Sequence, residues 1–292
     1  MLKETPILII AWIRVDKVEK IFNKLNSYGC RNIFLSLDGP RLKNYKNDST
    51  AINKIEELAK KIFDQKVEIK KSSNNLGCKL GVKSAIDWFF ENVDRGIILE
   101  DDIVPEIEFI EFCTFYLEEY KNDQRIFSIS GLNGYLNWLF YPPMKNNELS
   151  RRWFVWGWAT WKDRWVNKYS EKVDIDLNLI YKILDFYQWN YGLAMEFLIS
   201  ILKVNLNYID TWDFQVQALC LKRNLLNIIP KNRYIKNIGF DESATHTNFH
   251  LDYFENINKS MRNKQLTKEI NLPFERESHG MIAIKSNTNY SN

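Results

Sequence analysis

Three consecutive carboxylates, Glu100-Asp101-Asp102, are the residues in this sequence whose types and spacing most directly suggest chemistry. They follow the apolar run 97–99, which is typical of a buried strand, and Pro105 closes the turn after them. Adjacent carboxylates repel each other, and Mg²⁺ or Mn²⁺ offsets that repulsion by binding one or two carboxylates together with water and phosphate oxygens. The triplet therefore predicts a divalent cation site. The alternative is an acidic turn, or N-cap residues for the next helix.

Arg14 and Asp38 each follow an apolar run that predicts a strand. Ligands of open parallel sheets bind outside the carboxyl ends of the strands. An aspartate at such a position can accept the imide N–H of uracil, and an arginine can stack on or hydrogen-bond a base or phosphate. Taken singly, the arginine is more often a surface residue and Asp-Gly-Pro is more often only a turn. Their joint placement favours nucleotide binding.

Five of the ten tryptophans lie between Trp153 and Trp165. One interpretation is an apolar segment that packs the core of the second half of the chain. The other is a platform for a sugar, because pyranose C–H faces stack on aromatic rings while indole N–H groups bond hydroxyls. Both interpretations can hold together.

Two further polar residues stand near the end of the patterned sequence. Asp213 lies at the start of an expected helix, where it is either a first-turn or N-cap residue or a general base at the edge of an apolar pocket. His246 lies in a polar stretch, where a lone histidine is ordinarily a surface residue.

The elements that must position these side chains alternate between strands and helices over the first 130 residues. Strands are expected at 7–10, 33–37, 67–69 and 97–99, with amphipathic helices between them. A helix at 107–120, a strand at 126–129, an irregular loop at 131–150 and helices near 177–188, 191–203 and 213–223 are expected to follow. This alternation predicts an α/β fold: a Rossmann-like, mostly parallel sheet flanked by helices, with a more helical C-terminal half.

Composition excludes several classes of protein. The chain has 292 residues, 45% of them apolar and 26% charged, which excludes a disordered or fibrous protein. Lys and Arg number 40 against 37 Asp and Glu, and a net charge of +3 is too small for a protein that binds bulk nucleic acid. We expect no transmembrane helix, because no apolar run approaches the required length. The N-terminus is read as a first strand and not as a signal peptide.

The four cysteines, Cys30, Cys78, Cys113 and Cys220, are widely spaced and accompanied by only three histidines. This spacing argues against a structural zinc site and a disulfide scaffold, so reduced thiols in the cytoplasm are expected. The chain is expected to divide into a first part at 1–130, a second part at 131–254, and a polar basic tail at 255–292. Such a tail is usually solvated, and contact with an anionic membrane surface is the minority interpretation.

The motifs taken together, over roughly residues 5–250, resemble the N-acetylglucosaminyltransferase I type of inverting, GT-A-fold glycosyltransferase and related bacterial enzymes of surface-glycan synthesis. The resemblance rests on Pro6–Ala11 followed by Arg14, Asp38, Leu99-Glu100-Asp101-Asp102, Trp156-Gly157-Trp158 and Trp212-Asp213, with a weaker match at Thr245-His246. The chain departs from that family at 74–79, before the third helix, where Lys79 is the candidate for the family's basic contact.

The resemblance implies a role for each matched position. Arg14 and Asp38 would contact the base, and Glu100 and Asp101 the base and ribose side of the donor. Asp102 would ligate Mn²⁺ or Mg²⁺, and His246 would approach the diphosphate or the metal. Asp213 would be the general base. Trp156, Gly157 and Trp158 would border the donor sugar and the acceptor.

The resulting expectation is a metal-dependent hexosyl- or N-acetylhexosaminyltransferase. It would move sugar from a nucleoside-diphosphate donor, with UDP favoured, to a hydroxyl of an oligosaccharide or lipid-linked glycan with inversion. The setting would be capsule, lipopolysaccharide or other surface-glycan synthesis, in the cytoplasm or at the inner face of its membrane. The alternatives are a sugar-phosphate nucleotidyltransferase, which normally has a Gly-rich loop that 11–16 lacks, and a non-enzymatic carbohydrate-binding protein.

Overall fold

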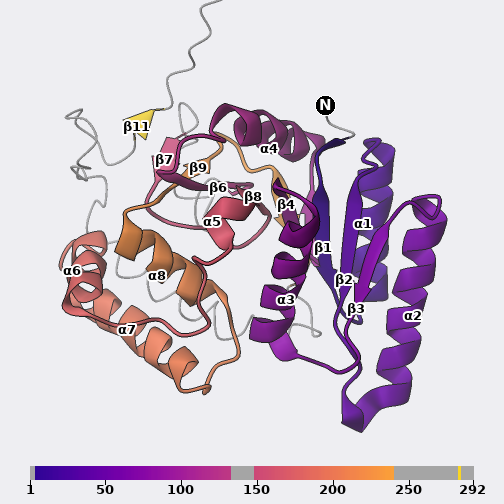
Figure 1. The fold of residues 1–292 in the computed structure, drawn as a ribbon, viewed down its shortest axis with the longest axis horizontal. Coiled ribbons are helices and arrows are strands. Elements are labelled where there is room, and N and C mark those ends of the chain that lie inside the picture. The colour runs from indigo at the N-terminus through magenta and orange to yellow at the C-terminus, as the bar shows by residue number, and fades with distance from the viewer. Residues whose placement is uncertain (1–3, 133–147, 240–281, 284–292) are drawn as a thin grey trace, which may run out of the picture.

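The computed structural model describes residues 4–132, 148–239 and 282–283. Within these residues the chain folds around a nine-stranded sheet with helices on both faces (Figure 1). From edge to edge its strands are β3 (Glu68–Lys71), β2 (Ile33–Leu37), β1 (Ile7–Ala11), β4 (Arg95–Glu100), β8 (Trp158–Trp161), β6 (Ile126–Ser130), β9 (Leu226–Ile229), β7 (Glu148–Ser150) and β11 (Ile282–Ala283).

Most of the strands run in one direction. β1 pairs in parallel with β2 and β4, and β2 with β3. β8 is antiparallel to both β4 and β6, and β6 is parallel to β9. β7 is antiparallel to β9 and to β11. Only β7 and β8 are therefore reversed among these nine strands, which confirms the expected α/β class with a mostly parallel sheet.

The helices form two layers and one outer group. α1 (Val15–Ser27), α2 (Tyr45–Ile62) and α4 (Ile107–Glu119) cover one face of the sheet. α3 (Gly77–Asn92), α5 (Lys162–Trp165) and α8 (Asp213–Arg223) cover the other. α6 (Leu177–Phe186) and α7 (Tyr191–Asn205) pack on α8, and a short 3₁₀ turn, η2 (Leu42–Asn44), precedes α2. The expected helical character of the second half is thus confirmed.

The apolar sequence of β1 follows from its burial on both faces. Ile7 and Ile9 pack into the core under α1, whereas Leu8 packs into the opposite core under α3, and all three are 0% exposed. A strand covered on both sides has no polar face, so it appears in sequence as a continuous apolar run. The same reasoning accounts for β4, whose apolar run ends only at Glu100, the last residue at the carboxyl end of the strand.

A small second sheet follows the acidic turn. β5 (Ile103–Pro105) pairs antiparallel with β10 (Ile235–Asn237), and the backbone N–H of Ile238 donates to the Asp102 carbonyl oxygen at 2.9 Å. This pairing brings residues 237–239 against Asp102 despite their separation along the chain.

Two segments differ from expectation. Of the expected loop at 131–150, Glu148–Ser150 form strand β7, and 133–147 lie outside the described residues. The Trp-rich segment contributes a central strand, β8, which was not predicted. Four residues are too few for a period of two to be distinguished from a buried turn or helix.

Candidate functional site

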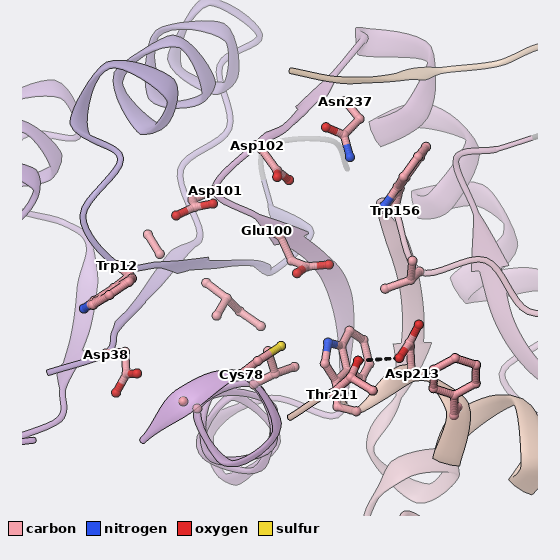
Figure 2. Close-up of a pocket in the computed structure, with 18 of the residues that line it drawn as sticks. Trp12, Asp38, Cys78, Glu100, Asp101, Asp102, Trp156, Thr211, Asp213 and Asn237 are labelled. Atoms are coloured by element: carbon pink, nitrogen blue, oxygen red, sulfur yellow. Dashed lines mark hydrogen bonds between the residues drawn. The ribbon is translucent and has the colours of Figure 1, made fainter. Parts of the chain in front are cut away.

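The carboxyl ends of β1 and β4 open into a pocket of about 630 Å³ (Figure 2). The start of α3, residues 152–156 and the start of α8 complete its wall. Seven residues that the sequence nominated line it: Arg14, Asp38, Glu100, Asp101, Asp102, Trp156 and Asp213. The fold therefore brings together side chains that are up to 199 positions apart in the sequence.

The acidic turn is a concentration of partly buried negative charge. Glu100 ends β4, and the side chains of Asp101 and Asp102 are only 13% and 18% exposed. Burial, followed by the neighbouring carboxylates, raises the pKa of Glu100 well above its usual value. Burial also raises the pKa of Asp102, and it raises the pKa of Asp101 to about 6. These shifts mean that the surroundings disfavour three ionised carboxylates together.

Arg14 is bound to this turn. Its Nη1 donates to Asp101 Oδ1 and to Asp102 Oδ2, each at 2.9 Å. A guanidinium shared in this way holds the two carboxylates side by side and offsets part of their repulsion. The contact with a nucleotide base expected for Arg14 stays a prediction, because the described contacts are with the acidic turn.

Asp102 shares a narrow space with Asn237 and Gly239. A Cβ placed on Gly239 would lie 2.2 Å from Asp102 Oδ2 and 3.0 Å from Asn237 Oδ1, so a larger residue there would have to displace these side chains. The Gly239 N–H donates to Asn237 Oδ1 at 2.6 Å, which fixes the amide oxygen and leaves it a second lone pair. In Figure 2, Asn237 and Asp102 lie at the same end of the pocket. Asn237 was not predicted, because nothing in its local sequence marks it.

Asp38 is engaged by the loop before α3. Its carboxylate accepts from the backbone N–H of Leu76 at 2.9 Å, from Asn75 Nδ2 at 2.8 Å and from the Gly39 N–H at 2.8 Å. Burial nevertheless raises its pKa. Asp38 therefore organises the 75–76 loop, and its contact with a nucleotide base stays a prediction.

Trp12 and Arg41 form a flat surface beside Asp38 that was not predicted from the sequence. The Arg41 guanidinium lies 4.4 Å from the centre of the Trp12 ring. Trp12 Nε1 donates to the Gly39 carbonyl at 2.9 Å, and Arg41 Nε donates to Asp48 at 2.9 Å. The position of Trp12 directly after β1 was the available signal. An aromatic ring with a guanidinium on it is suited to stacking against a planar ligand.

The tryptophan cluster is chiefly core. Trp153, Trp158, Trp161 and Trp165 are 1–6% exposed, and Trp158 packs against Trp153, Trp165 and Trp212. Trp156 lines the pocket, whereas Trp158 does not. Strand β8 buries the Trp158 ring between α3 and α8, which gives it a packing role, and its expected contact with sugar stays a prediction.

Gly157 also stays out of the pocket lining. Its φ is +61°, and a Cβ there would lie 3.0 Å from the side chain of Ile235 and 3.2 Å from that of Ile103. Its carbonyl accepts from the Gly131 N–H at 2.8 Å. Gly157 thus serves the backbone turn into β8, since its left-handed conformation and tight surroundings exclude side chains.

Asp213 begins α8 and faces the pocket from the side opposite Asp38 (Figure 2). The Thr211 hydroxyl donates to Asp213 Oδ1. Trp212, between them, is 2% exposed and packs in the aromatic core. The local sequence therefore places Thr211 and Asp213 at the pocket surface, while the buried ring of Trp212 between them holds the backbone in place. Asp213 is a first-turn residue of α8, and Trp212 is the N-cap residue.

The first turn of α3 is held by residues that the sequence did not nominate. Asp210 accepts from the backbone N–H of Cys78 at 2.7 Å and of Lys79 at 3.0 Å. The Lys79 ammonium donates to Asn207 Oδ1 at 2.7 Å, and its side chain is absent from the pocket lining. In the described structure the Lys79 ammonium thus contacts the α7–α8 connection, and its role as the family's basic contact stays a prediction.

Two features predicted from the sequence lie outside the described residues. They are His246 and, apart from β11, the tail at 255–292. Within the described residues, no group of three or more His, Cys, Asp or Glu side chains is arranged to hold a metal ion. Among those same residues, no helix is both long and apolar enough to cross a membrane.

Comparison with known proteins gives weak likenesses. No protein-family model and no curated protein matches the sequence. Among solved structures, HddC from Yersinia pseudotuberculosis has 17% identity and a TM-score of 0.26, covering 40% of this chain and 53% of that one, about half its length. A UDP-glucose pyrophosphorylase complexed with UDP-glucose has 8% identity and a TM-score of 0.37, covering 88% of this chain and 99% of that one.

A third similar structure is mannose-1-phosphate geranyltransferase from Thermus thermophilus. It has 9% identity and a TM-score of 0.34, and the match covers 78% of this chain and 73% of that one. At these identities and scores, none of the three likenesses carries an argument about this chain.

Proposed function

We propose that this chain is an inverting, GT-A-type transferase that moves a sugar from a nucleoside-diphosphate donor, with UDP favoured, to a hydroxyl of a glycan acceptor. The observation that carries the proposal is that one pocket contains both the acidic turn at the end of β4 and Asp213 at the start of α8. A sugar-transfer reaction needs these two functions: a charged site for the leaving diphosphate and a base for the attacking hydroxyl.

The residues present fit a hard divalent cation. Asp102 Oδ2 and Asn237 Oδ1 lie close to the same point, and both are oxygen ligands of the kind that Mg²⁺ and Mn²⁺ prefer. Burial disfavours the ionised acidic turn even though Arg14 and Lys17 act on Asp102 as counter-charges, so a further cation would stabilise it. Because the described part of the chain offers no larger ligand cluster, substrate oxygens and water would complete the coordination. Such an ion would offset the charge of the departing diphosphate.

The protein's own residues would bind and orient the two substrates. Asp38 and the Trp12–Arg41 surface would receive the base, and Glu100 and Asp101 would face the ribose and sugar side. Asp213 would take the proton of the acceptor hydroxyl as that oxygen attacks the anomeric carbon. Thr211 donates a hydrogen bond that orients this carboxylate, and within the described residues its other oxygen is placed to accept from the acceptor hydroxyl. Trp156 would border the sugar.

The experiment is calorimetric titration of the full chain with UDP, GDP and CMP, each with Mn²⁺ and with EDTA. We expect one nucleotide to bind only with metal, and Asp102→Ala to abolish that binding. Asp174→Ala is the matched control, because this aspartate is 85% exposed and pairs with Lys222 away from the pocket. The control should bind like the wild type.

The same titration contradicts the proposal if no nucleotide binds under any condition, or if Asp102→Ala binds as tightly as the wild type. Incubation with nucleotide sugars and sugar phosphates then separates the alternatives by product. Release of a nucleoside diphosphate supports the transferase, release of inorganic pyrophosphate from a nucleoside triphosphate supports a nucleotidyltransferase, and metal-independent sugar binding supports a carbohydrate-binding protein.

A further inference from the structure

The start of α3 and the segment before α8 are joined by a set of polar contacts at the protein surface. A helix leaves its first backbone N–H groups without intrahelical acceptors. Here the Leu76 N–H donates to the Asp38 carboxylate. The N–H groups of Cys78 and Lys79 donate to the Asp210 carboxylate. Two carboxylates thus accept from backbone N–H groups on either side of Gly77, Asp38 from the loop before α3 and Asp210 from the first turn of α3.

The Asp210 contact is closely fitted. Gly77 has a φ of +78°, and a Cβ on it would lie 2.4 Å from Asp210 Oδ2. The carboxylate therefore lies directly against the backbone at the helix start, where negative charge is also favoured by the helix dipole. A second contact reinforces the junction: the buried Lys79 side chain, 8% exposed, donates its ammonium hydrogen to Asn207.

The same segment carries Asp213 three residues later. Asp210 fixes its beginning against α3, and the 2%-exposed ring of Trp212 fixes it in the aromatic core. Thr211, between these two anchors, donates to the Asp213 carboxylate. The position of Asp213 relative to the Asp38 side of the pocket is therefore set through Asp210 and the first turn of α3.

We propose that Asp210 is a positioning residue: by bonding the Cys78 and Lys79 N–H groups it sets where Asp213 stands relative to the donor. This inference rests on the proposed function. It assigns no substrate contact to Asp210, which is absent from the pocket lining. Small displacements of a reacting group lower the rate by large factors. A residue that holds the general base Asp213 in position is therefore expected to affect turnover more than substrate binding.

The test compares Asp210→Ala and Asp210→Asn with Asp176→Ala. Asp176 is the matched control because it caps α6 in the same chemical way, accepting from the Leu179 N–H at 2.7 Å, and does not line the pocket. Two quantities are measured: the affinity for UDP with Mn²⁺ by calorimetry, and turnover as UDP released from UDP-glucose and UDP-N-acetylglucosamine. Circular dichroism and the melting temperature report folding.

Asp210→Ala is expected to lower turnover about 10- to 100-fold while changing the UDP affinity by no more than about twofold. Asp210→Asn is expected to fall between it and the wild type, because asparagine keeps one accepting oxygen. Asp176→Ala should lower the melting temperature similarly and leave turnover unchanged. If Asp210→Ala does not fold, Asn207→Ala loosens the same junction through Lys79 and should also reduce turnover.

Unchanged turnover in folded Asp210→Ala, or equal losses of turnover in Asp210→Ala and Asp176→Ala, would overturn the inference and leave the proposed function standing. A wild-type protein that neither binds UDP nor releases it would instead reject the proposed function, and the inference with it. The wild-type measurements therefore separate the two failures.

Discussion

At the scale of single residues, the site contains carboxylates with different surroundings. Glu100, Asp101 and Asp102 are crowded, and burial raises the pKa of each. Asp213 comes from a separate element, α8, and has a hydroxyl donor beside it, although its charge also acts on Glu100. A crowded, buried group gains from a cation, whereas a separated carboxylate with free lone pairs is suited to accept a proton. This contrast underlies the different roles proposed for the acidic turn and for Asp213.

Asp213→Asn should therefore lower turnover by about 10²- to 10⁴-fold, because an amide cannot remove the acceptor proton. Asparagine retains an oxygen that can accept from Thr211, so the local structure and UDP binding should be preserved. UDP release and calorimetry measure the two effects. Glu108→Gln is the control, since Glu108 is an exposed first-turn acid of α4. Normal turnover in Asp213→Asn would remove Asp213 from the mechanism.

At the scale of elements, the loop after β2 depends on an ion pair at the start of α2. Asp48, whose side chain is 1% exposed, accepts from the backbone N–H of Arg41 at 3.0 Å and from its Nη2 at 3.0 Å. Asn44 donates to the same carboxylate at 2.8 Å. These donors, the Arg41 side chain first, lower the pKa of Asp48 to about 2. The same contacts hold Arg41 over Trp12 at the pocket edge.

Asp48→Asn should reduce the free energy of unfolding at pH 7 by about 1–2 kcal/mol, the lower end allowing for solvent screening at the half-exposed Arg41. Because the pKa is lowered in the folded state, this stabilisation is fully present above the unfolded value near 3.8 and is lost as pH falls through about 2. Urea unfolding of both proteins across this range measures it. A difference that persists undiminished at pH 2 would contradict the ionic origin.

The elements of the first half were predictable because their signals are local. Buried parallel strands appear as apolar runs, and the stripe Val18, Ile21, Phe22 and Leu25 marked α1, where all four are 0% exposed. The apolar runs of these strands are followed by Arg14, Asp38 and Glu100. The carboxyl ends of the strands, where the pocket lies, were therefore identifiable from the sequence alone. The physical cause is that burial on both faces leaves polar residues only where strands end.

The contacts that complete the site were not predictable from local sequence. Asp210 and Lys79 are 131 positions apart, and Asn237 reaches Asp102 only through the pairing of β10 with β5. In the sequence, each of these side chains looks like an ordinary polar residue with no local pattern that marks its contact. The Trp-rich segment was ambiguous for a different reason: apolar aromatic residues suit both a core and a sugar platform, and only the strand pairing of β8 decides which rings are buried.

At the scale of the whole molecule, β8 joins the two halves of the sheet. It lies between β4, which continues into β1, β2 and β3, and β6, which continues into β9, β7 and β11, and it is antiparallel to both neighbours. Its first residue, Trp158, stacks at 6.2 Å on Phe127 and at 6.0 Å on Trp212, which precedes Asp213. The buried Trp158 ring therefore packs against a ring of β6 and against the ring of Trp212, the residue before the proposed general base.

Trp158→Ala distinguishes this packing role from direct contact with sugar. Removal of a fully buried tryptophan should reduce the free energy of unfolding by about 3–5 kcal/mol, because the cavity cannot close completely. Affinity for the nucleotide sugar UDP-glucose in the protein that remains folded should be unchanged, since the ring does not line the pocket. Trp189→Ala is the control: its side chain is 48% exposed on the α6–α7 connection, and its loss should cost at most about 0.5 kcal/mol. Urea unfolding and calorimetry at saturating Mn²⁺ measure both quantities. Weaker nucleotide-sugar binding by Trp158→Ala at wild-type stability would restore the sugar-platform interpretation, because a core residue cannot be removed without loss of stability.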